Sequence, residues 1–200
     1  GACIYDIKTH TIVHPQTLST SQINFLFQLA KKYHKKLWCY TDDLTKVIVN
    51  FNPVAENNPE LAFFDGEFIQ YDSALTIQNK SYKCIVMDVN KNDDFIIAAR
   101  GQNIEIAIDA SGTAEINAPE ISKLAGLKWI LSQWNIALSE MMAIGDSIIN
   151  DYWMIKNVGL GIAMENSQEQ IKAIAKEVTT TVETGGVAKM IEKYILNNRK

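Results

Sequence analysis

The pattern of apolar and polar positions divides the chain near Pro119. Residues 1–14 alternate in the manner of a β-hairpin, with a turn near Lys8 and Thr9. From Ser21 to about Lys35 the apolar residues recur at helical spacing, and Ser19 or Thr20 can cap that helix. The first part of the chain is therefore predicted to begin with a hairpin that leads into one long helix.

Short β-branched and aromatic runs fill the middle of the chain. They predict strands at residues 36–40, 47–51, 73–77, 83–89 and 104–109, and a helix at 93–100. A segment rich in Asn and Pro, residues 52–59, is predicted to be a loop that leaves the sheet. This middle part is predicted to be an α/β module of antiparallel character.

After Pro119 the elements alternate regularly. Helices are predicted at 122–134, from about 148 to just before Gly159, at 168–175 and at 186–196, and strands at 141–144, 159–164 and 178–180. Such alternation is typical of a parallel, doubly wound sheet. Because the central strands of such a sheet are paired on both sides, we expect further strands beside these and an uncovered sheet edge through which the chain associates.

Composition narrows the class of protein. The 200 residues are 47% hydrophobic and 21% charged, as in an ordinary globular protein. No apolar run reaches the roughly 18 residues that cross a bilayer, and the first residues lack the features of a signal peptide. Cys3, Cys39 and Cys84 are far apart, which fits neither a disulfide framework nor a zinc site. We expect a cytoplasmic protein with no membrane partner.

The net charge of the chain bears on whether it binds nucleic acids or anionic membranes. A net charge of −4 with scattered basic residues argues against a nucleic-acid or anionic-membrane partner, since both require a basic face. Only the doublets Lys31-Lys32 and Lys35-Lys36 cluster. They lie at the end of the predicted helix, where cations favour the helix dipole, so a solvated helix end is preferred to a binding patch.

The candidate chemistry lies in residues 141–155, MMAIGDSIINDYWMI. The predicted strand ends in Gly145-Asp146, and ligands of doubly wound sheets bind at the carboxyl ends of strands. Asp151 follows after a short turn and can return to the same space. Two carboxylates there suit a hard cation such as Mg²⁺. The alternative is structural, with Gly-Asp as a strand-ending turn and Asp151 as the acid at a helix N-terminus.

Lys123, in EISKLAGLKWIL, adds a cation to this set. A lysine near the start of the preceding helix can lie above the same strand ends, where its charge would hold a phosphoryl oxygen. Taken by itself, Lys123 is an ordinary surface lysine.

Three segments carry a resemblance to a known family: PEISKLAGLKWIL, AIGDSIINDYWMIKNVGLGIAMENSQEQIKAIAKEVT and ETGGVAKMIEKYI. They resemble the last part of the Cof-type sugar phosphatases of the haloacid dehalogenase superfamily, whose large cap is inserted between two halves of the core. The opening GACIYD is similar to the strand that leads into that cap. The resemblance implies a connecting hairpin at 1–15, an α/β cap domain at 16–117, and the C-terminal half of a doubly wound, Rossmann-like parallel core at 118–200.

The same resemblance implies the role of each site residue. Lys123 would hold phosphate, Asp146 would bind Mg²⁺, and Asp151 would position Asp146 or a metal-bound water as a second metal-site and catalytic acid. Asn150 would contact the substrate, and Asn166 would line the same crevice. In this subfamily the second acid usually follows the first by four residues, whereas here four residues intervene, Ser147 to Asn150. The roles of Asn150 and Asp151 are therefore less firmly implied than that of Asp146.

The nucleophile motif expected from the resemblance has no match in this chain. The family's nucleophile lies in an Asp-x-Asp motif, and the acidic pairs of this chain, at 42–43 and 93–94, fall in the expected cap. Without an attacking carboxylate, Lys and Asp bind but do not complete the reaction. The expected function is a magnesium-dependent phosphatase of small phosphorylated metabolites such as sugar phosphates, with the 200-residue chain alone inactive. The alternative is a non-catalytic relative that binds a ligand or partner.

Overall fold

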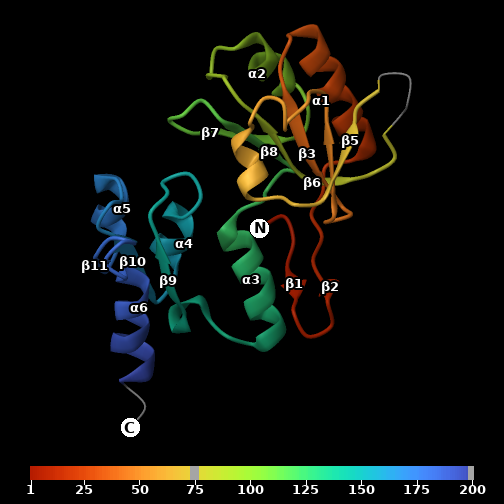
Figure 1. Cartoon of the computed structure of the whole chain (residues 1–200). Coiled ribbons are helices and arrows are strands. Elements are labelled where there is room, and N and C mark those ends of the chain that lie inside the picture. The colour runs from red at the N-terminus through yellow and green to blue at the C-terminus, as the bar shows by residue number, and fades with distance from the viewer. Residues whose placement is uncertain (73–76, 198–200) are drawn as a thin grey trace. The chain divides into compact units, whose positions relative to one another are not determined.

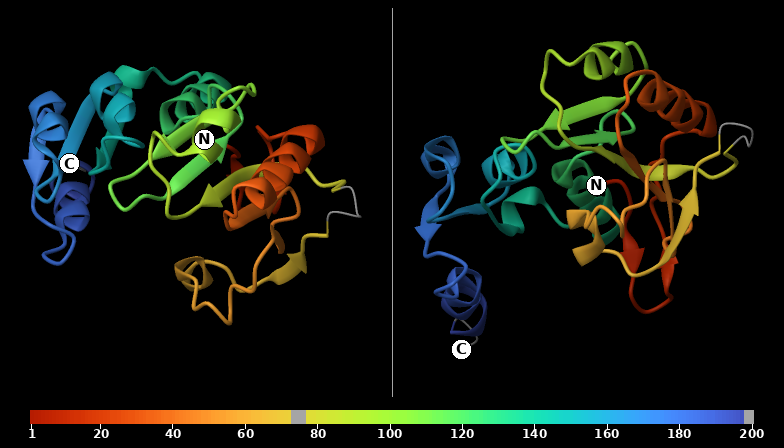
Figure 2. Two further views of the ribbon diagram at one scale, coloured as in Figure 1. Left: turned by 90° about the horizontal axis from the view of Figure 1, so that it is seen from above. Right: turned by 45° about the horizontal axis from the view of Figure 1, so that its top comes forward.

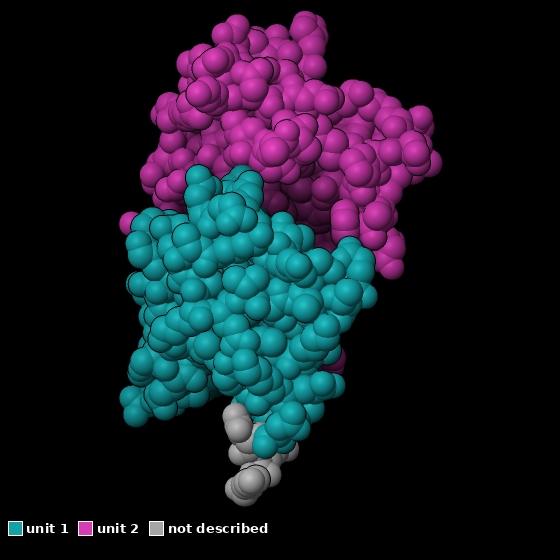
Figure 3. All heavy atoms as spheres, turned by 90° about the vertical axis from the view of Figure 1, so that its left-hand side faces the viewer, with its two compact units in different colours: residues 1, 122–200 teal, residues 2–121 magenta. Residues whose placement is uncertain are grey.

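The computed structural model describes residues 1–72 and 77–197. The chain forms two compact units, which we call unit 1 (Gly1 and Ser122–Lys200) and unit 2 (Ala2–Ile121) (Figure 3). Most of the strand predicted at 73–77 lies outside the described residues. Within the described ranges, no helix has the length and apolar character needed to cross a membrane.

Unit 2 is built on a six-stranded sheet with the order β5-β4-β3-β6-β8-β7. Neighbouring strands are antiparallel except β4 and β5, which are parallel. The strands are β3 (Leu37–Thr41), β4 (Lys46–Val49), β5 (Glu67–Gln70), β6 (Ser81–Val86), β7 (Glu105–Ile108) and β8 (Ala114–Asn117). The antiparallel character was predicted, but β5 and β8 were not, because their runs are short and half-polar.

Helices cover one face of this sheet (Figure 1). Helix α1 (Thr20–Lys32) begins at a capping box formed by Ser19 and Gln22, and α2 (Asp94–Ala99) begins at Asp93, whose side chain accepts from the Phe95 amide. Their apolar residues share a core with one side of the sheet. Both α1 and α2 were predicted from the sequence, α1 by the spacing of its apolar residues.

The opposite face of the sheet carries a separate aromatic cluster. The rings of Trp38 and Phe64 each contact those of Tyr40 and Phe68 as well as one another. Leu61 of the 3₁₀ helix η1 (Pro59–Ala62) packs against the same cluster. A small antiparallel hairpin, β1 (Tyr5–Asp6) and β2 (Thr11–Ile12), also belongs to unit 2. The predicted hairpin at the start of the chain is thus present.

Unit 1 contains a three-stranded parallel sheet with the order β11-β10-β9 (Figure 2). Its strands are β9 (Met142–Gly145), β10 (Leu160–Met164) and β11 (Glu177–Thr179). Its helices are α3 (Lys123–Trp134), η2 (Leu138–Glu140), α4 (Tyr152–Asn157), α5 (Glu169–Ile174), α6 (Gly186–Ile191) and the π-helical η3 (Glu192–Leu196). The parallel strand–helix alternation predicted after Pro119 is confirmed.

Two helices of unit 1 differ from their predicted extents. The helix expected from about residue 148 begins at Tyr152, because residues 147–151 form a turn instead. The closing helix changes to π-helical geometry after Ile191. Among the described residues β9 pairs only with β10, so its other edge carries no strand partner.

Candidate functional site at the end of strand β9

The candidate site lies at the carboxyl end of the parallel sheet in unit 1. Gly145 at the end of β9 is in register with Ala163 of β10, so the residues that follow the two strands emerge at the same edge. Asp146 follows β9, and Asn166 follows β10. This edge is where doubly wound sheets bind ligands.

A tight turn brings Asp151 back to the end of β9. Its backbone amide donates to the Ser147 carbonyl at 2.8 Å. Its Oδ2 atom accepts hydrogen bonds from the amides of Asp146 and Ser147, both at 3.0 Å. Although Asp151 is the N-cap of α4, its side chain makes no capping hydrogen bond. The carboxylate therefore organises the loop after β9, and Asp151 also stands at the N-terminus of α4, as in the structural alternative.

Gly145 makes room for this carboxylate. A Cβ atom at position 145 would lie 2.6 Å from Cγ and from Oδ2 of Asp151. A side chain there would displace Asp151, so the glycine that precedes Asp146 is a steric requirement of the turn.

Lys123 completes an ion pair with Asp151. Ser122 caps α3 by accepting from the Ala125 amide at 3.0 Å, which makes Lys123 the first residue of the helix. The Lys123 Nζ atom lies 2.6 Å from Asp151 Oδ1, with side chains 53% and 4% exposed respectively. A cation in the first turn opposes the helix dipole. Its pairing with Asp151 offsets that cost and leaves part of the ammonium accessible to solvent.

The environment of Asp151 changes its acidity. Burial raises the pKa of this carboxyl, but the hydrogen bond from Lys123 and those from the Ser147 and Asp146 amides outweigh it, so the pKa is lower than its ordinary value. Asp151 is thus held as a carboxylate whose two oxygens are both engaged.

Asp146 differs from Asp151 in its exposure. Its carboxylate is exposed, and its Oδ2 accepts from Asn166 Nδ2 at 3.2 Å. Asn150 lies exposed on the turn, and its amide donates to Ser147 Oγ at 3.2 Å. The structure therefore brings Lys123, Asp151, Asp146 and Asn166 together, while the Asn150 side chain has no hydrogen bond with the described residues.

This donor set fits a hard cation. Mg²⁺ is usually held through one or two carboxylates, with waters and substrate phosphate as its other ligands. The exposed Asp146 carboxylate offers oxygen at the strand end, whereas the oxygens of Asp151 are taken by Lys123 and two amides. In the described ranges there is no group of three or more His, Cys, Asp or Glu side chains placed to hold a metal.

Two serines of the site were not predicted. Ser147 donates its amide to Asp151, and the buried Ser167 lies with its Oγ 3.4 Å from the Gly145 carbonyl, to which it donates. The bond from Ser167 joins the loop after β10 to the end of β9. No signal in the sequence distinguishes Ser167 from a serine in an ordinary turn.

Comparison with known proteins supports a single family. The chain matches the family of haloacid dehalogenase-like hydrolases over residues 1–191. It is 30% identical over 196 residues to the 5-amino-6-(5-phospho-D-ribitylamino)uracil phosphatase YcsE of Bacillus subtilis, an alignment that covers 98% of this chain and 70% of that protein. The chain belongs to the haloacid dehalogenase-like hydrolases.

Solved structures agree on the fold of this hydrolase. A haloacid dehalogenase-like hydrolase from Bacteroides thetaiotaomicron superposes with a TM-score of 0.80 at 24% identity, covering 96% of this chain and 73% of that one. A haloacid dehalogenase subclass IIB sugar phosphatase superposes with a TM-score of 0.73 at 16% identity, covering 93% and 70% of the two chains. The resemblance on which the sequence analysis depended is confirmed.

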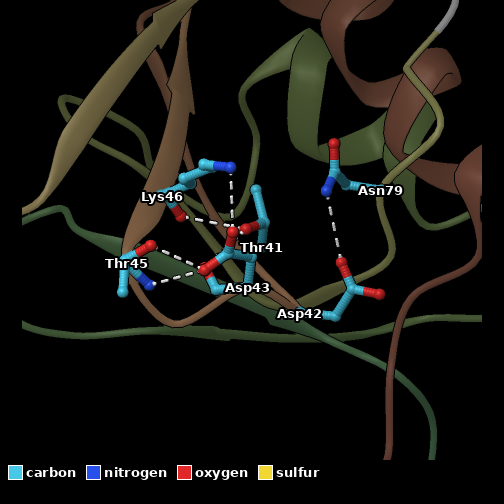
Figure 4. A network of polar contacts seen from close by, with 6 residues as sticks. All are labelled: Thr41, Asp42, Asp43, Thr45, Lys46 and Asn79. Carbon is cyan, nitrogen blue, oxygen red and sulfur yellow. Dashed lines mark hydrogen bonds and ion pairs between the residues drawn. The ribbon is translucent and has the colours of Figure 1, made fainter.

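The remaining acidic pairs of this hydrolase have structural roles. Asp43 lies in the β3–β4 turn, where its Oδ1 accepts from the amide and hydroxyl of Thr45 and its Oδ2 pairs with Lys46 at 3.0 Å (Figure 4). Its neighbour Asp42 accepts from Asn79 at 3.4 Å. Asp93 caps α2 and pairs with Lys35 at 2.6 Å. These contacts stabilise a turn and a helix start within unit 2.

Proposed function

We propose that this chain belongs to a magnesium-dependent phosphatase that acts on small phosphorylated metabolites, such as sugar phosphates, in the cytoplasm. The observation that carries the proposal is the pairing of the half-exposed Lys123 with the buried Asp151 beside the exposed Asp146. The activity named for the Bacillus subtilis relative supports it and adds a phosphorylated ribitylaminouracil to the substrates to be tested.

Each residue has a distinct part in this proposal. Lys123 holds a phosphoryl oxygen, and Asp151 orients Lys123 and fixes the loop that presents Asp146. Asp146 provides the carboxylate ligand of Mg²⁺, and Asp151 reaches the metal site through the Asp146 amide or a water. When bound, the ion supplies positive charge that offsets the phosphoryl oxygens. Asn150 and Asn166 line the crevice as hydrogen-bonding groups for the substrate.

The attacking carboxylate has no counterpart among the 200 residues, since they contain no Asp-x-Asp sequence. We therefore expect the chain by itself to bind phosphate and metal without hydrolysing a phosphate ester. The competing function is that of a binding protein without catalysis. The upstream coding sequence gives the first check, because an Asp-x-Asp strand there favours the enzyme.

The deciding experiment is hydrolysis of an aryl phosphate with and without Mg²⁺. It compares residues 1–200, a longer form that carries the Asp-x-Asp strand, and that longer form with Asp146→Asn. We expect no turnover by residues 1–200, magnesium-dependent turnover by the longer form, and a loss on the order of a hundredfold in the variant. The exposed Asp65→Asn in unit 2 is the matched control.

Two results would contradict the proposal. Turnover by residues 1–200 would mean that the nucleophile lies within this chain. An inactive longer form with an intact Asp-x-Asp strand would favour the binding protein.

A further inference from the structure

Two of the three cysteines meet in the sheet of unit 2, although they are far apart in the sequence. Cys39 lies on β3 and Cys84 on β6, and the two residues stand opposite one another in the antiparallel register. Strands β3 and β6 are the two central strands of the six-stranded sheet (Figure 1). The fold therefore pairs two thiols that no spacing rule joins.

The two cysteine side chains share one buried face of the sheet. Both residues are 0% exposed, and both belong to the core formed with α1 and α2. The neighbours of Cys39 along β3, Trp38 and Tyr40, belong to the aromatic cluster on the other face. Residues opposite one another in paired strands project their side chains to the same side of the sheet. The Cys39 and Cys84 side chains are therefore direct neighbours.

The surroundings keep Cys84 in its thiol form. The hydrogen bond with the Cys39 thiol and burial both raise the pKa of Cys84, and they outweigh the opposite effect of the Ser81 hydroxyl, which lies 3.7 Å from Cys84 Sγ. A thiol is a much weaker nucleophile than a thiolate. The pair is therefore unreactive while β3 and β6 stay closed.

The spacing of paired strands suits a bond between these two side chains. Opposite residues in antiparallel strands have Cα atoms about 4.5 or 5.5 Å apart, and disulfides span Cα separations of about 4.4–6.8 Å. Their Cβ atoms lie about 4.5–5.5 Å apart, against about 3.5–4.5 Å in a disulfide. A disulfide here requires the side chains to approach by about 1 Å and no change of strand register.

We propose that Cys39 and Cys84 form a thiol–disulfide site, at which a small-molecule disulfide such as oxidised glutathione joins β3 to β6 while the sheet keeps its register. The thiolate of one cysteine attacks the oxidant and releases one glutathione thiolate, and the second cysteine then attacks the mixed disulfide and releases the other. The two protein thiols lose two electrons and two protons, and oxidised glutathione is reduced to two thiols. The site belongs to unit 2 alone, and its chemistry does not depend on the proposed phosphatase function.

The test is the distribution of disulfides in the 200-residue chain after refolding from urea into equimolar reduced and oxidised glutathione, compared with the chain kept in urea. Alkylation blocks the free thiols, and peptide mapping identifies the pairs. In the folded chain we expect mostly the bond between Cys39 and Cys84, because the fold makes its second step intramolecular. In urea we expect the bond between Cys3 and Cys39 at a comparable level, since closure entropy depends only weakly on loop length. Equal distributions in the two conditions would overturn the proposal.

A second experiment begins from the folded chain and needs no refolding. Cys3 is partly exposed, whereas the buried pair reacts only when β3 and β6 separate locally. We expect glutathione to modify Cys3 first, and the bond between Cys39 and Cys84 to form about tenfold faster in urea below the unfolding midpoint. Lasting mixed disulfides of glutathione with Cys39 or Cys84 would contradict the proposal, because a neighbouring thiol resolves them.

Stability shows whether the sheet accepts the bond. Cys3→Ala leaves only the paired cysteines, and oxidation of this variant should raise its urea midpoint by on the order of 1 M. Cys84→Ala is the matched control, because it retains two cysteines that the sheet does not pair, and the oxidant should not raise its midpoint. If this control does not fold, the oxidised and reduced forms of Cys3→Ala still decide the question. An unchanged or lower midpoint in oxidised Cys3→Ala would show that the bond distorts the sheet, and the proposed site would be wrong.

Discussion

Asp43 in unit 2 and Asp151 in unit 1 are carboxylates with similar sets of partners. Asp43 accepts from one backbone amide and one hydroxyl, Asp151 accepts from two backbone amides, and each pairs with a lysine. The partners of Asp43 lie within three residues of it, and its side chain is 40% exposed. Asp151 meets a lysine 28 residues away, and its side chain is 4% exposed.

The sequence distance of the partners and the burial of the side chain distinguish the turn that holds Asp43 from the candidate site that holds Asp151. The contacts of Asp43 stabilise only the β3–β4 turn, as the network in Figure 4 shows. Those of Asp151 join the start of α3 to the end of β9, because the carboxylate binds both the half-exposed Lys123 side chain and the backbone amide of Asp146. Long-range pairing of a buried acid at a strand end is therefore the feature on which the proposed function depends.

The largest effect is expected from Gly145→Ala. The added Cβ would lie 2.6 Å from the Asp151 carboxylate and force it out of its place. We expect a loss of about 3 kcal/mol in the free energy of unfolding of unit 1, as for overpacked cores, measured by urea denaturation. Gly126→Ala in α3 is the control, because its Cβ would meet Gly1 Cα at 3.4 Å and alanine favours helix. Equal losses in the two variants would show that Gly145 has no special steric role.

The next effect is expected from Asp151→Asn. The amide cannot serve both Lys123 and the two backbone donors as an anion does, so we expect a loss of about 2 kcal/mol in the free energy of unfolding. Asp43→Asn, the matched variant in the local turn, should lose much less, because exposed pairs contribute little. Urea denaturation of both variants under the same conditions measures the two losses in the free energy of unfolding. A larger loss in Asp43→Asn than in Asp151→Asn would contradict the prediction.

Much of this contrast could be anticipated from the sequence. Gly145-Asp146 at the end of an apolar run, with Asp151 one turn later, identified the strand end and its acids because side-chain periodicity is a local signal. Lys123 was placed near the same strand ends because it starts the preceding helix, and the family pattern then implied its role; no local rule predicts its ion pair with Asp151, 28 residues away in sequence. Ser167 was missed because its bond to Gly145 depends on the register between β9 and β10.

The fold likewise shows that local sequence signals do not predict what depends on long-range contacts. Long periodic elements such as α1 and α3 were predicted to within a few residues, whereas β5 and β8 were not predicted, because strand pairing supplies the order that their short runs lack. The helix predicted from about residue 148 begins only at Tyr152. Local propensity cannot register that the Asp151 side chain instead binds the amides of Asp146 and Ser147 and holds the preceding residues in a turn.

A smaller effect is expected from Lys123→Met. Asp151 keeps its two amide donors, and the lysine is already half exposed, so we expect a loss of about 1 kcal/mol in the free energy of unfolding. The loss should shrink as salt is added. Lys46→Met removes the lysine that pairs with Asp43 in unit 2, and it should lower the free energy of unfolding less than Lys123→Met does. A salt-independent loss would show that the lysine acts through packing of its alkyl chain.

The smallest effect is expected from the pH dependence of the stability that Asp151 provides. Because the folded-state pKa of Asp151 lies below its ordinary value of 3.8, its contribution to stability is present above that value and is lost as pH falls through the folded-state pKa. The difference in unfolding free energy between the wild type and Asp151→Asn should therefore be constant near about pH 6 and shrink below about pH 4. In Asp43 the hydrogen bonds from Thr45 lower the pKa to about 2, so its carboxyl should titrate near that value by NMR. Because solvent screens the exposed Asp43, the difference in unfolding free energy between the wild type and Asp43→Asn should depend less on pH than the difference for Asp151→Asn. If the Asp151→Asn difference instead grew as the pH fell, the carboxylate would be destabilising where it lies, and the contrast between the two acids would fail.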